Sequence, residues 1–285
     1  MQALYDLPAP AKLNLFLHIT GRRADGYHLM QSVFMLIDWC DSLHIALRQD
    51  GAISREDLAD GPPLPAQDLI VRAAQALQAA TGCRLGAHIG VHKRIPAQAG
   101  MGGGSSDAAT TLLALNRLWN LRLTRRQLQT IGLQLGADVP FFLCGRNAWV
   151  EGIGDIIAPL EIAYQPPPAR FLVVKPAAGL ETKTIFSHPT LERDSDSATI
   201  SGFAANHFGF GRNNLQPVAQ TLCAEVNEAL AWLKTKGLQG RMTGSGSAVF
   251  APMLHTVDLN DANSAWKIKV CNNLELHPLA GWALD

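Results

Sequence analysis

The stretch Pro96-Ala97-Gln98-Ala99-Gly100-Met101-Gly102-Gly103-Gly104-Ser105-Ser106-Asp107-Ala108-Ala109 places four glycines within five residues, directly before two hydroxyl side chains and a segment of high helix propensity. Glycine tolerates positive φ and lets a ligand approach the backbone with no side chain in the way. The first N–H groups of the following helix are unpaired and favour a bound anion such as a phosphate. Glycine-rich turns also occur in solvated loops, but the order of strand, proline, glycines, serines and helix favours a phosphate-handling enzyme.

Two familiar phosphate-binding patterns do not fit this glycine loop (residues 96–109). The GxxxxGK[ST] pattern is lacking, so no lysine stands where a Walker A loop requires one. The glycines are also not followed, roughly 20 residues later, by an acid that could hold the ribose of a dinucleotide. The sequence therefore disfavours a dinucleotide-binding dehydrogenase.

Composition is that of an ordinary globular protein with no bias toward a polyanionic partner. The 285 residues are 47% hydrophobic and 17% charged, sufficient for one large domain or two modest ones with a substantial core. Lysine plus arginine and aspartate plus glutamate number 24 each, and no basic stripe or polybasic run is present. We therefore expect a small-molecule partner and neither nucleic acid nor a membrane surface, while the oligomeric state is left open.

Cysteine usage and hydropathy point to a cytoplasmic protein. The five cysteines are scattered without a CxxC pair, which argues against a disulfide framework and against a zinc site. The N-terminus lacks a basic segment followed by a long apolar run, so we expect no signal peptide. No window holds roughly 18 uninterrupted apolar residues, so we expect no transmembrane helix.

The residues before the glycine loop are expected to form two strands, a loop and a helix. Side chains alternate between apolar and other types over residues 11–19, which is the period of a strand, and a charged turn leads into a second strand over residues 27–37. Residues 50–67 are polar and contain Gly61-Pro62-Pro63, so we expect a surface loop there. Residues 68–80 have helical spacing, with Asp68 as a candidate N-cap.

The residues from the loop onward alternate between strands and helices. A strand over residues 87–95 feeds the loop, an apolar helical stripe runs from Ala108 to Leu118, and a helix capped by Thr124 follows over residues 124–135. Proline-rich residues 165–168 mark a candidate boundary between domains 1–165 and 166–285.

The second half offers fewer patterns. Residues 171–174 read as a buried strand, residues 218–236 as a helix that ends at Gly237, and Gly244-Ser245-Gly246 as a turn before a strand. Residues 187–212 match no regular pattern. Interspersed strands and helices make the chain an α+β or α/β protein.

Three polar residues outside the glycine loop have the chemistry for phosphoryl transfer. Lys12 and Asn14 share one face of the first strand, about 6–7 Å apart, although a strand lysine is also typical of a solvated face. Asp138 follows a helix end and precedes a proline, where an aspartate commonly caps or turns the chain. Phosphoryl transfer requires in-line positioning and neutralisation of charge, which a lysine, an aspartate, a metal ion and a glycine loop together supply.

Aromatic residues offer a weaker indication of a ligand. Tyr27 and His28 could present a stacking ring and a hydrogen-bonding ring, and Phe186 could present a second stacking ring. Taken alone, residues of these types are more often part of ordinary packing than of a binding site.

Taken together, these residues resemble the GHMP kinase superfamily. Its ATP-binding loop is a proline–glycine–serine–serine element like residues 96–109, here with Met101 where leucine is usual. Further segments similar to one branch of that superfamily are residues 10–15, 23–28, 136–141 and 242–250, which follow the family's order over nearly the whole chain. The resemblance implies an α+β fold of two domains, the first like domain 2 of ribosomal protein S5 and the second ferredoxin-like.

The matching branch transfers phosphate from Mg·ATP to the 2-hydroxyl of 4-(cytidine 5'-diphospho)-2-C-methyl-D-erythritol in non-mevalonate isoprenoid synthesis. By resemblance, Asp138 would orient or deprotonate that hydroxyl and Lys12 would stabilise the developing charge. His28 would read the cytosine edge between the rings of Tyr27 and Phe186, with Asn14 and Thr182 also near the substrate. The nucleotide site would comprise Asp68, Lys93, Gly100, Met101, Gly102, Gly103, Gly104, Ser105 and Ser106, and Ser106 is a candidate Mg²⁺ contact.

One departure and two alternatives accompany this interpretation. The family usually has asparagine where this chain has Asp68, and a carboxylate can accept a hydrogen bond from an adenine amino group but cannot donate one. Another small-molecule GHMP kinase, acting on homoserine or mevalonate, would share the loop without needing the aromatic set. A nucleotide-binding regulator that has lost catalysis is the second alternative, against which the presence of Lys12 and Asp138 argues.

Overall fold

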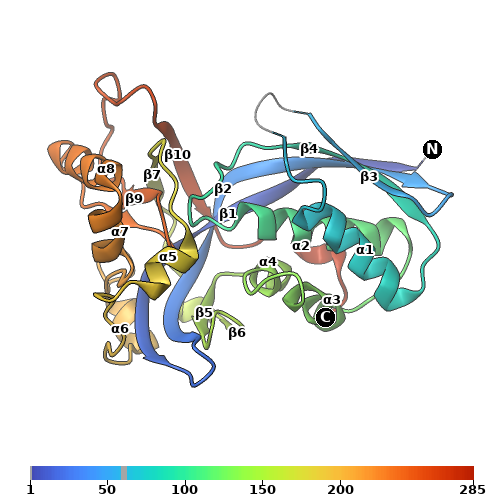
Figure 1. Ribbon diagram of the computed structural model, residues 1–285, viewed down its shortest axis with the longest axis horizontal. Helices are drawn as coiled ribbons and strands as arrows, with labels where there is room; N and C mark the ends of the chain where they lie inside the picture. The colour runs from blue at the N-terminus through green and yellow to red at the C-terminus, as the bar shows by residue number, and fades with distance from the viewer. Residues whose placement is uncertain (1, 59–62) are drawn as a thin grey trace.

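The computed structural model describes residues 2–58 and 63–285, and two long strands organise it (Figure 1). Strands β1 (Ala3–Arg22) and β2 (His28–Arg48) pair antiparallel along nearly their whole lengths and contain the two expected N-terminal strands. Ala11 and Leu13 on one face of β1 are fully buried, yet Lys12 and Asn14 on the other are only 4% and 1% exposed. The face that carries Lys12 is therefore not a solvated one.

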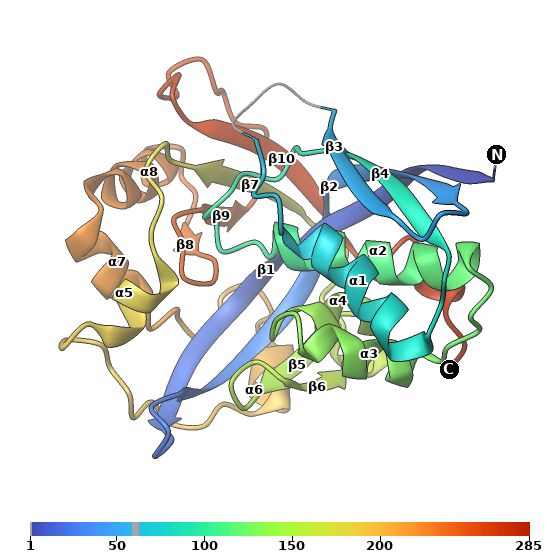
Figure 2. The same cartoon turned by 45° about the vertical axis from the view of Figure 1, so that its right-hand side comes forward.

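The first half of the chain packs helices against one face of a sheet, as both views show (Figures 1 and 2). Strand β4 (Gly86–His92) pairs antiparallel with β2 and parallel with β3 (Ile53–Asp57). The helices are α1 (Leu69–Thr81), α2 (Gly103–Leu118), α3 (Arg125–Leu133) and α4 (Val139–Cys144). A short hairpin of β5 (Ala148–Glu151) and β6 (Ile156–Pro159) extends the sheet from β2.

Strand β3 corrects the expected loop over residues 50–67. Residues 53–57 pair in register with β4, although Ile-Ser-Arg-Glu-Asp has no apolar alternation. An edge strand can be this polar because hydrogen bonds to its neighbour, and not burial of a side-chain face, hold it in place. Residues 59–62 of the expected loop lie outside the described residues.

Helix ends agree with the expected capping residues in the first half. The Asp68 side chain accepts a hydrogen bond from the Val71 amide at 3.0 Å, and Thr124 forms a capping box with Gln127. The helix after the glycine loop begins at Gly103, earlier than its apolar stripe, because Gly102 supplies the left-handed backbone (φ 72°) that precedes the first turn.

The second half forms a smaller sheet that continues the first. Strand β7 (Arg170–Lys175) lies between β10 (Lys267–Leu274) and β9 (Val249–Pro252), and β9 pairs with β8 (Arg241–Met242). Its helices are α5 (Thr182–Ser187), α6 (Ile200–Ala205), α7 (Gln216–Leu222) and α8 (Ala224–Thr235), with short 3₁₀ turns at Ile162–Tyr164 and Ala280–Trp282. The expected strand over residues 171–174 is confirmed and fully buried. The single helix expected over residues 218–236 is wrong, because extended backbone at Cys223 separates α7 from α8.

The two halves are joined by more than the linker at residues 165–168. Strand β10 pairs with β2 at Asn273–Ile37 and Leu274–Leu36, and the last residues return to α3, where Arg125 Nε lies 2.7 Å from Asp285 Oδ1. The division at residue 165 stays a prediction. Among the described residues, no helix has the length and apolar character needed to cross a membrane.

Candidate active site

A cavity of about 900 Å³ is lined by residues from both halves of the chain and by the glycine loop. Most of the predicted site residues line it together. They are Lys12, Asn14, Asp68, Lys93, Gly100, Met101, Gly102, Gly103, Gly104, Asp138, Thr182 and Phe186. Four predicted residues, Tyr27, His28, Ser105 and Ser106, lie outside this lining.

The glycine loop presents free amide groups to the cavity. No side chain caps α2, and the first intrahelical bond of this turn runs from the Ser106 amide to the Gly102 carbonyl at 2.9 Å. The preceding helical amides, those of Gly103, Gly104 and Ser105, have no intrahelical acceptor because they belong to the first turn. Two of these three residues line the cavity, so the helix start can bind an anion there.

The second glycine turn, Gly244-Ser245-Gly246, packs directly against the glycine loop. A Cβ on Gly100 (φ +70°) would lie 2.3 Å from the Thr243 carbonyl oxygen, and one on Gly244 (φ +53°) would lie 2.7 Å from the Gly100 carbonyl oxygen. The Ser247 amide also donates to the Gln98 carbonyl at 3.0 Å. Glycine at position 100 is therefore required by backbone packing between the two halves as well as by the turn.

Lys12 and Asp138, which both line the cavity, form an ion pair. Lys12 Nζ lies 3.8 Å from Asp138 Oδ2, donates to Asn14 Oδ1 at 2.5 Å, and stands 4.3 Å from the centre of the Phe34 ring. The Lys12 amide donates to the Met101 carbonyl at 3.0 Å, which anchors the glycine loop to β1. Burial lowers the pKa of Lys12, and the Asp138 carboxylate opposes that shift.

Asn14 is held in one orientation by neighbours from two other segments. Its amide NH₂ donates to the Ser32 hydroxyl at 3.0 Å, and its backbone amide donates to the Thr243 hydroxyl at 2.9 Å. Ser32 in turn donates to the Phe16 carbonyl. These contacts leave the Asn14 carbonyl oxygen for Lys12 and Thr243.

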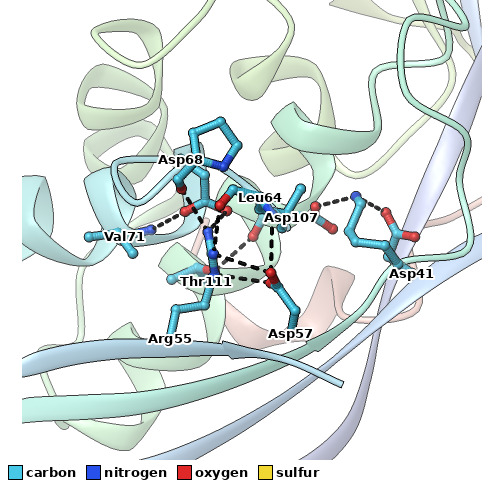
Figure 3. A network of polar contacts seen from close by, with 10 residues as sticks. Asp41, Arg55, Asp57, Leu64, Asp68, Val71, Asp107 and Thr111 are labelled. Atoms are coloured by element: carbon cyan, nitrogen blue, oxygen red, sulfur yellow. Dashed lines mark hydrogen bonds and ion pairs between the residues drawn. The ribbon is translucent and has the colours of Figure 1, made fainter. Parts of the chain in front are cut away.

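The predicted nucleotide residue Lys93 forms ion pairs with two buried carboxylates, those of Asp41 and Asp107, which are labelled in Figure 3. Its Nζ contacts Asp41 Oδ2 and donates to Asp107 Oδ2 at 2.5 Å. Asp41 also accepts from the backbone amide of Ile95 at 2.8 Å, so it holds the start of the glycine loop. Burial raises the pKa of Asp107 to about 8 against the attraction of Lys93. Burial lowers the pKa of Lys93, but Asp107 and Asp41 outweigh this and raise it overall.

Asp68 has both carboxylate oxygens engaged (Figure 3). Its Oδ1 accepts from the Val71 amide, and its Oδ2 lies 3.0 Å from Nη1 of Arg55, whose side chain is 9% exposed. Where the family usually has asparagine, this chain therefore has an aspartate, Asp68, whose charge is paired with the guanidinium group of Arg55 on β3.

Three residues, Tyr27, His28 and Phe186, are predicted to form an aromatic wall, and the structure brings His28 and Phe186 together. The rings of His28 and Phe186 lie 5.2 Å apart between centroids, while Tyr27 is 60% exposed and points to no neighbouring ring among the described contacts. Arg193 Nε donates to His28 Nε2 at 3.0 Å and other guanidinium nitrogens donate to the carbonyls of Phe186, His188 and Leu191. Partial burial, with the charges of Arg193 and Arg22, lowers the pKa of His28. Because Nε2 accepts from Arg193, Nδ1 is the nitrogen that carries the hydrogen of the neutral ring.

Two predicted hydroxyl contacts have different environments. The exposed Thr182 hydroxyl lies 2.7 Å from that of Ser245 at the cavity. Ser106 is fully buried in the first turn of α2, and neither its Oγ nor Asp107 Oδ1 has a hydrogen-bond partner among the residues that the structure describes. Oxygen atoms of this kind are the ligands that Mg²⁺ prefers, so the two residues fit a magnesium site at the phosphate end.

Comparison with known proteins agrees with this geometry. The model of the GHMP kinases N terminal domain matches residues 68–146, and that of the GHMP kinases C terminal domain matches residues 198–271. The 4-diphosphocytidyl-2-C-methyl-D-erythritol kinase of Acidovorax sp. (strain JS42) is 71% identical over 282 residues, covering 99% of both chains. The kinase of the same name from Paracidovorax citrulli (strain AAC00-1) is 72% identical over 285 residues, covering 100% of this chain and 99% of its own.

The chain belongs to the 4-diphosphocytidyl-2-C-methyl-D-erythritol kinase family of GHMP kinases. A crystal structure of a 4-(cytidine 5'-diphospho)-2C-methyl-D-erythritol kinase superposes with a TM-score of 0.76 at 29% identity, covering 95% of this chain and 99% of its own. The homoserine kinase of Cytophaga hutchinsonii superposes with a TM-score of 0.70 at 13% identity, over 97% and 96% of the two chains, which shows the shared fold alone. The chain is thus an ATP-dependent small-molecule kinase with the two-domain GHMP fold.

Several residues of this GHMP kinase site are not predicted from the sequence. Arg55 lies in a segment that reads as a loop, and Arg193 lies in residues 187–212, which match no pattern. Asp41 contacts Lys93, which is 52 residues away in the sequence, and Thr243 contacts Asn14, which is 229 residues away. The one available signal is the match of residues 242–250 to the family, which includes Thr243.

Proposed function

We propose that this kinase transfers the γ-phosphoryl group of ATP to the 2-hydroxyl of 4-(cytidine 5'-diphospho)-2-C-methyl-D-erythritol. The observation that carries the proposal is the Lys12–Asp138 ion pair, which faces the free amides of the glycine loop within one cavity. Identity of 71% to a relative with this name, over 99% of both chains, supports the same acceptor.

The glycine loop is the proposed site of the triphosphate. The amides of Gly103, Gly104 and Ser105 would donate to phosphate oxygens, as the positive end of α2 favours. Magnesium, when bound, neutralises charge on the transferred group, and Ser106 and Asp107 are the residues that would hold it. Lys93 lines the cavity and supports the phosphate end through its ion pairs with Asp41 and Asp107, and the third hydrogen of its ammonium group would be available to a phosphate oxygen.

Asp138 and Lys12 are the proposed catalytic residues. Asp138 would accept a hydrogen bond from the 2-hydroxyl, orient its oxygen in line with the γ-phosphorus, and receive the proton late in the transfer. The buried Lys12 ammonium, held beside Asp138, would stabilise the negative charge that develops on the equatorial oxygens. Asn14 keeps Lys12 in place, since its carbonyl oxygen accepts from Nζ.

We propose that the cytidine part of the substrate binds at the aromatic wall, which is the cytidine end of the cavity. Phe186 lines the cavity, and His28 packs against it with its protonated Nδ1 free to donate to a base acceptor. Tyr27 is exposed, and its ring would stack on the other face of the cytosine ring. Thr182, paired with Ser245 at the cavity, would contact the substrate between the base and the reacting hydroxyl.

An ATP-consumption assay with rival acceptors tests this function. The cytidine-diphosphate methylerythritol, mevalonate, homoserine and galactose would each be offered with Mg·ATP, and wild type would be compared with Asp138→Ala. We expect turnover confined to the cytidine acceptor and lost in the variant. Turnover with another acceptor would keep the phosphoryl chemistry and refute the substrate, and silence with all four would favour a regulatory role. We propose that the enzyme acts in the cytoplasm, since the proposed reaction uses ATP and a nucleotide-linked metabolite.

A further inference from the structure

Arg55 is the centre of a partly buried polar network (Figure 3), and three of the residues that it contacts, Leu64, Pro65 and Asp68, line the cavity. It projects from edge strand β3, with its side chain 9% exposed. Its Nη1 lies 3.0 Å from Asp68 Oδ2 and donates to the Pro65 carbonyl at 2.9 Å. Its Nη2 donates to the Leu64 carbonyl at 3.1 Å.

The residues that Arg55 holds are themselves part of the cavity wall. Leu64, Pro65 and Asp68 line the cavity, and they continue into Leu69 and Ile70 at the start of α1. Arg55 is not among the lining residues, so it acts through these neighbours. A second carboxylate, Asp57, lies 3.2 Å from Arg55 Nε and accepts the Leu64 amide at 3.0 Å.

The charge balance of this wall depends on Arg55. The Asp68 side chain is 11% exposed and, apart from the Val71 amide, its charge is compensated by Arg55 alone among the described contacts. Removing one member of a buried pair leaves an uncompensated charge in a poorly solvated place. Here that charge would be negative and would border a cavity whose ligand is a polyanion.

We propose that Arg55 is a positioning residue for nucleotide binding, which neutralises Asp68 and thereby makes an acidic wall compatible with ATP. The inference rests on the proposed function only in placing ATP along the glycine loop and the Asp68 side of the cavity. Arg55 touches neither substrate. Its ion pair with Asp68 holds the carboxylate in the geometry that caps helix α1. The second lone pair of each carboxylate oxygen is then available to accept a hydrogen bond from an amino group of the base.

A double-mutant cycle on ADP binding tests the proposal without any acceptor present. Isothermal titration of ADP would be performed on wild type, Arg55→Ala, Asp68→Asn and the double variant, each with its melting temperature. Asparagine is as good an N-cap as aspartate, so Asp68→Asn keeps helix α1 capped while removing the charge. Arg48→Ala is the matched control, because Arg48 pairs with Asp50 in an exposed position at the end of β2, a strand that β4 separates from β3.

The expected pattern is a specific loss and a specific rescue. Arg55→Ala should weaken ADP binding about tenfold, and adding Asp68→Asn should recover most of that loss, since the unpaired carboxylate that lines the cavity is then gone and the remaining one, Asp57, is not among the lining residues. The KM of the acceptor should stay within about twofold of wild type in every variant, and Arg48→Ala should bind ADP normally.

Several outcomes would overturn the proposal. Unchanged ADP affinity in Arg55→Ala would do so, and so would a double variant that binds no better than Arg55→Ala, since the arginine would then only brace the Leu64 and Pro65 carbonyls. A wild type that does not bind ADP would remove its premise. A wild type that binds ADP but leaves the cytidine acceptor untouched would refute the proposed function and still leave the cycle interpretable.

Discussion

At the glycine loop, the groups proposed to meet the triphosphate come from neighbouring residues on one turn, whereas the proposed cytidine end is assembled from segments far apart in sequence. The amides of Gly103 and Gly104 need only a free helix start. His28 on β2, Phe186 on α5 and Arg193 beyond it must instead be brought together by folding. The difference shows that a phosphate can be bound by local backbone geometry, while a base requires side chains that the tertiary structure gathers.

The largest effect is expected for a substitution of Asp138, a proposed catalytic residue that belongs to neither end. Asp138→Asn should lower kcat by about a thousandfold and leave both KM values within about twofold, because an amide cannot take the proton from the hydroxyl. Steady-state kinetics in both substrates would measure this. Asp50→Asn, at an exposed pair with Arg48, is the control. A loss of only a few-fold would remove Asp138 from the catalytic machinery.

The next largest effect is expected for Gly100→Ala, which tests whether the glycine loop depends on packing against a segment far away in the sequence. A Cβ there would lie 2.3 Å from the Thr243 carbonyl oxygen and would also be strained at φ +70°. We expect a loss of about 2–4 kcal/mol of unfolding free energy, measured by denaturant titration, together with weaker ATP binding. The control is Gly82→Ala, which has a similar φ of +66° and open space around it, and which should cost about 1 kcal/mol. Equal losses in the two variants would show that packing on the second glycine turn is unimportant.

A smaller effect is expected for Phe186→Ala at the cytidine end. Loss of one stacking face should raise the KM of the cytidine acceptor about 10- to 100-fold and leave the KM of ATP unchanged. Tyr5→Ala, at a ring that is 69% exposed and far along β1, should change neither constant. If both KM values rose together, Phe186 would be a packing residue and the two ends would not be separable.

The smallest effect is expected for a substitution of Arg193, which tests the orientation of the His28 ring at the cytidine end separately from stacking by Phe186. Arg193→Gln should raise the KM of the cytidine acceptor about 5- to 10-fold, because His28 loses the donor that keeps its hydrogen on Nδ1. Nitrogen chemical shifts of the His28 ring would report the tautomer directly. Arg212→Gln is the control, since Arg212 forms an exposed pair with Glu192 on the same segment. An unchanged tautomer with an unchanged KM would assign Arg193 to loop structure only.

Prediction from sequence succeeded where a residue's role depends on its neighbours along the chain. Asp68 and Thr124 cap the helices that follow them, and Lys12 and Asn14 share a strand face, because capping and strand alternation act over a few residues. It failed for β3, where polar Arg55 and its neighbours read as a loop, because pairing with β4 is a long-range contact. Arg193 was missed for the same reason.

The sequence by itself determined the phosphate loop, since glycines before a helix start and a lysine on a strand face follow from local order, and the resemblance of its segments to a known family supplied the family, the reaction type and the α+β class. Only the tertiary structure decided that Lys12 is buried beside Asp138, that Gly100 packs on Thr243, and that Arg55 compensates Asp68. These contacts join residues far apart in the chain. Their energies come from desolvation, packing and charge compensation, which depend on the surroundings of each group and not on its neighbours in sequence.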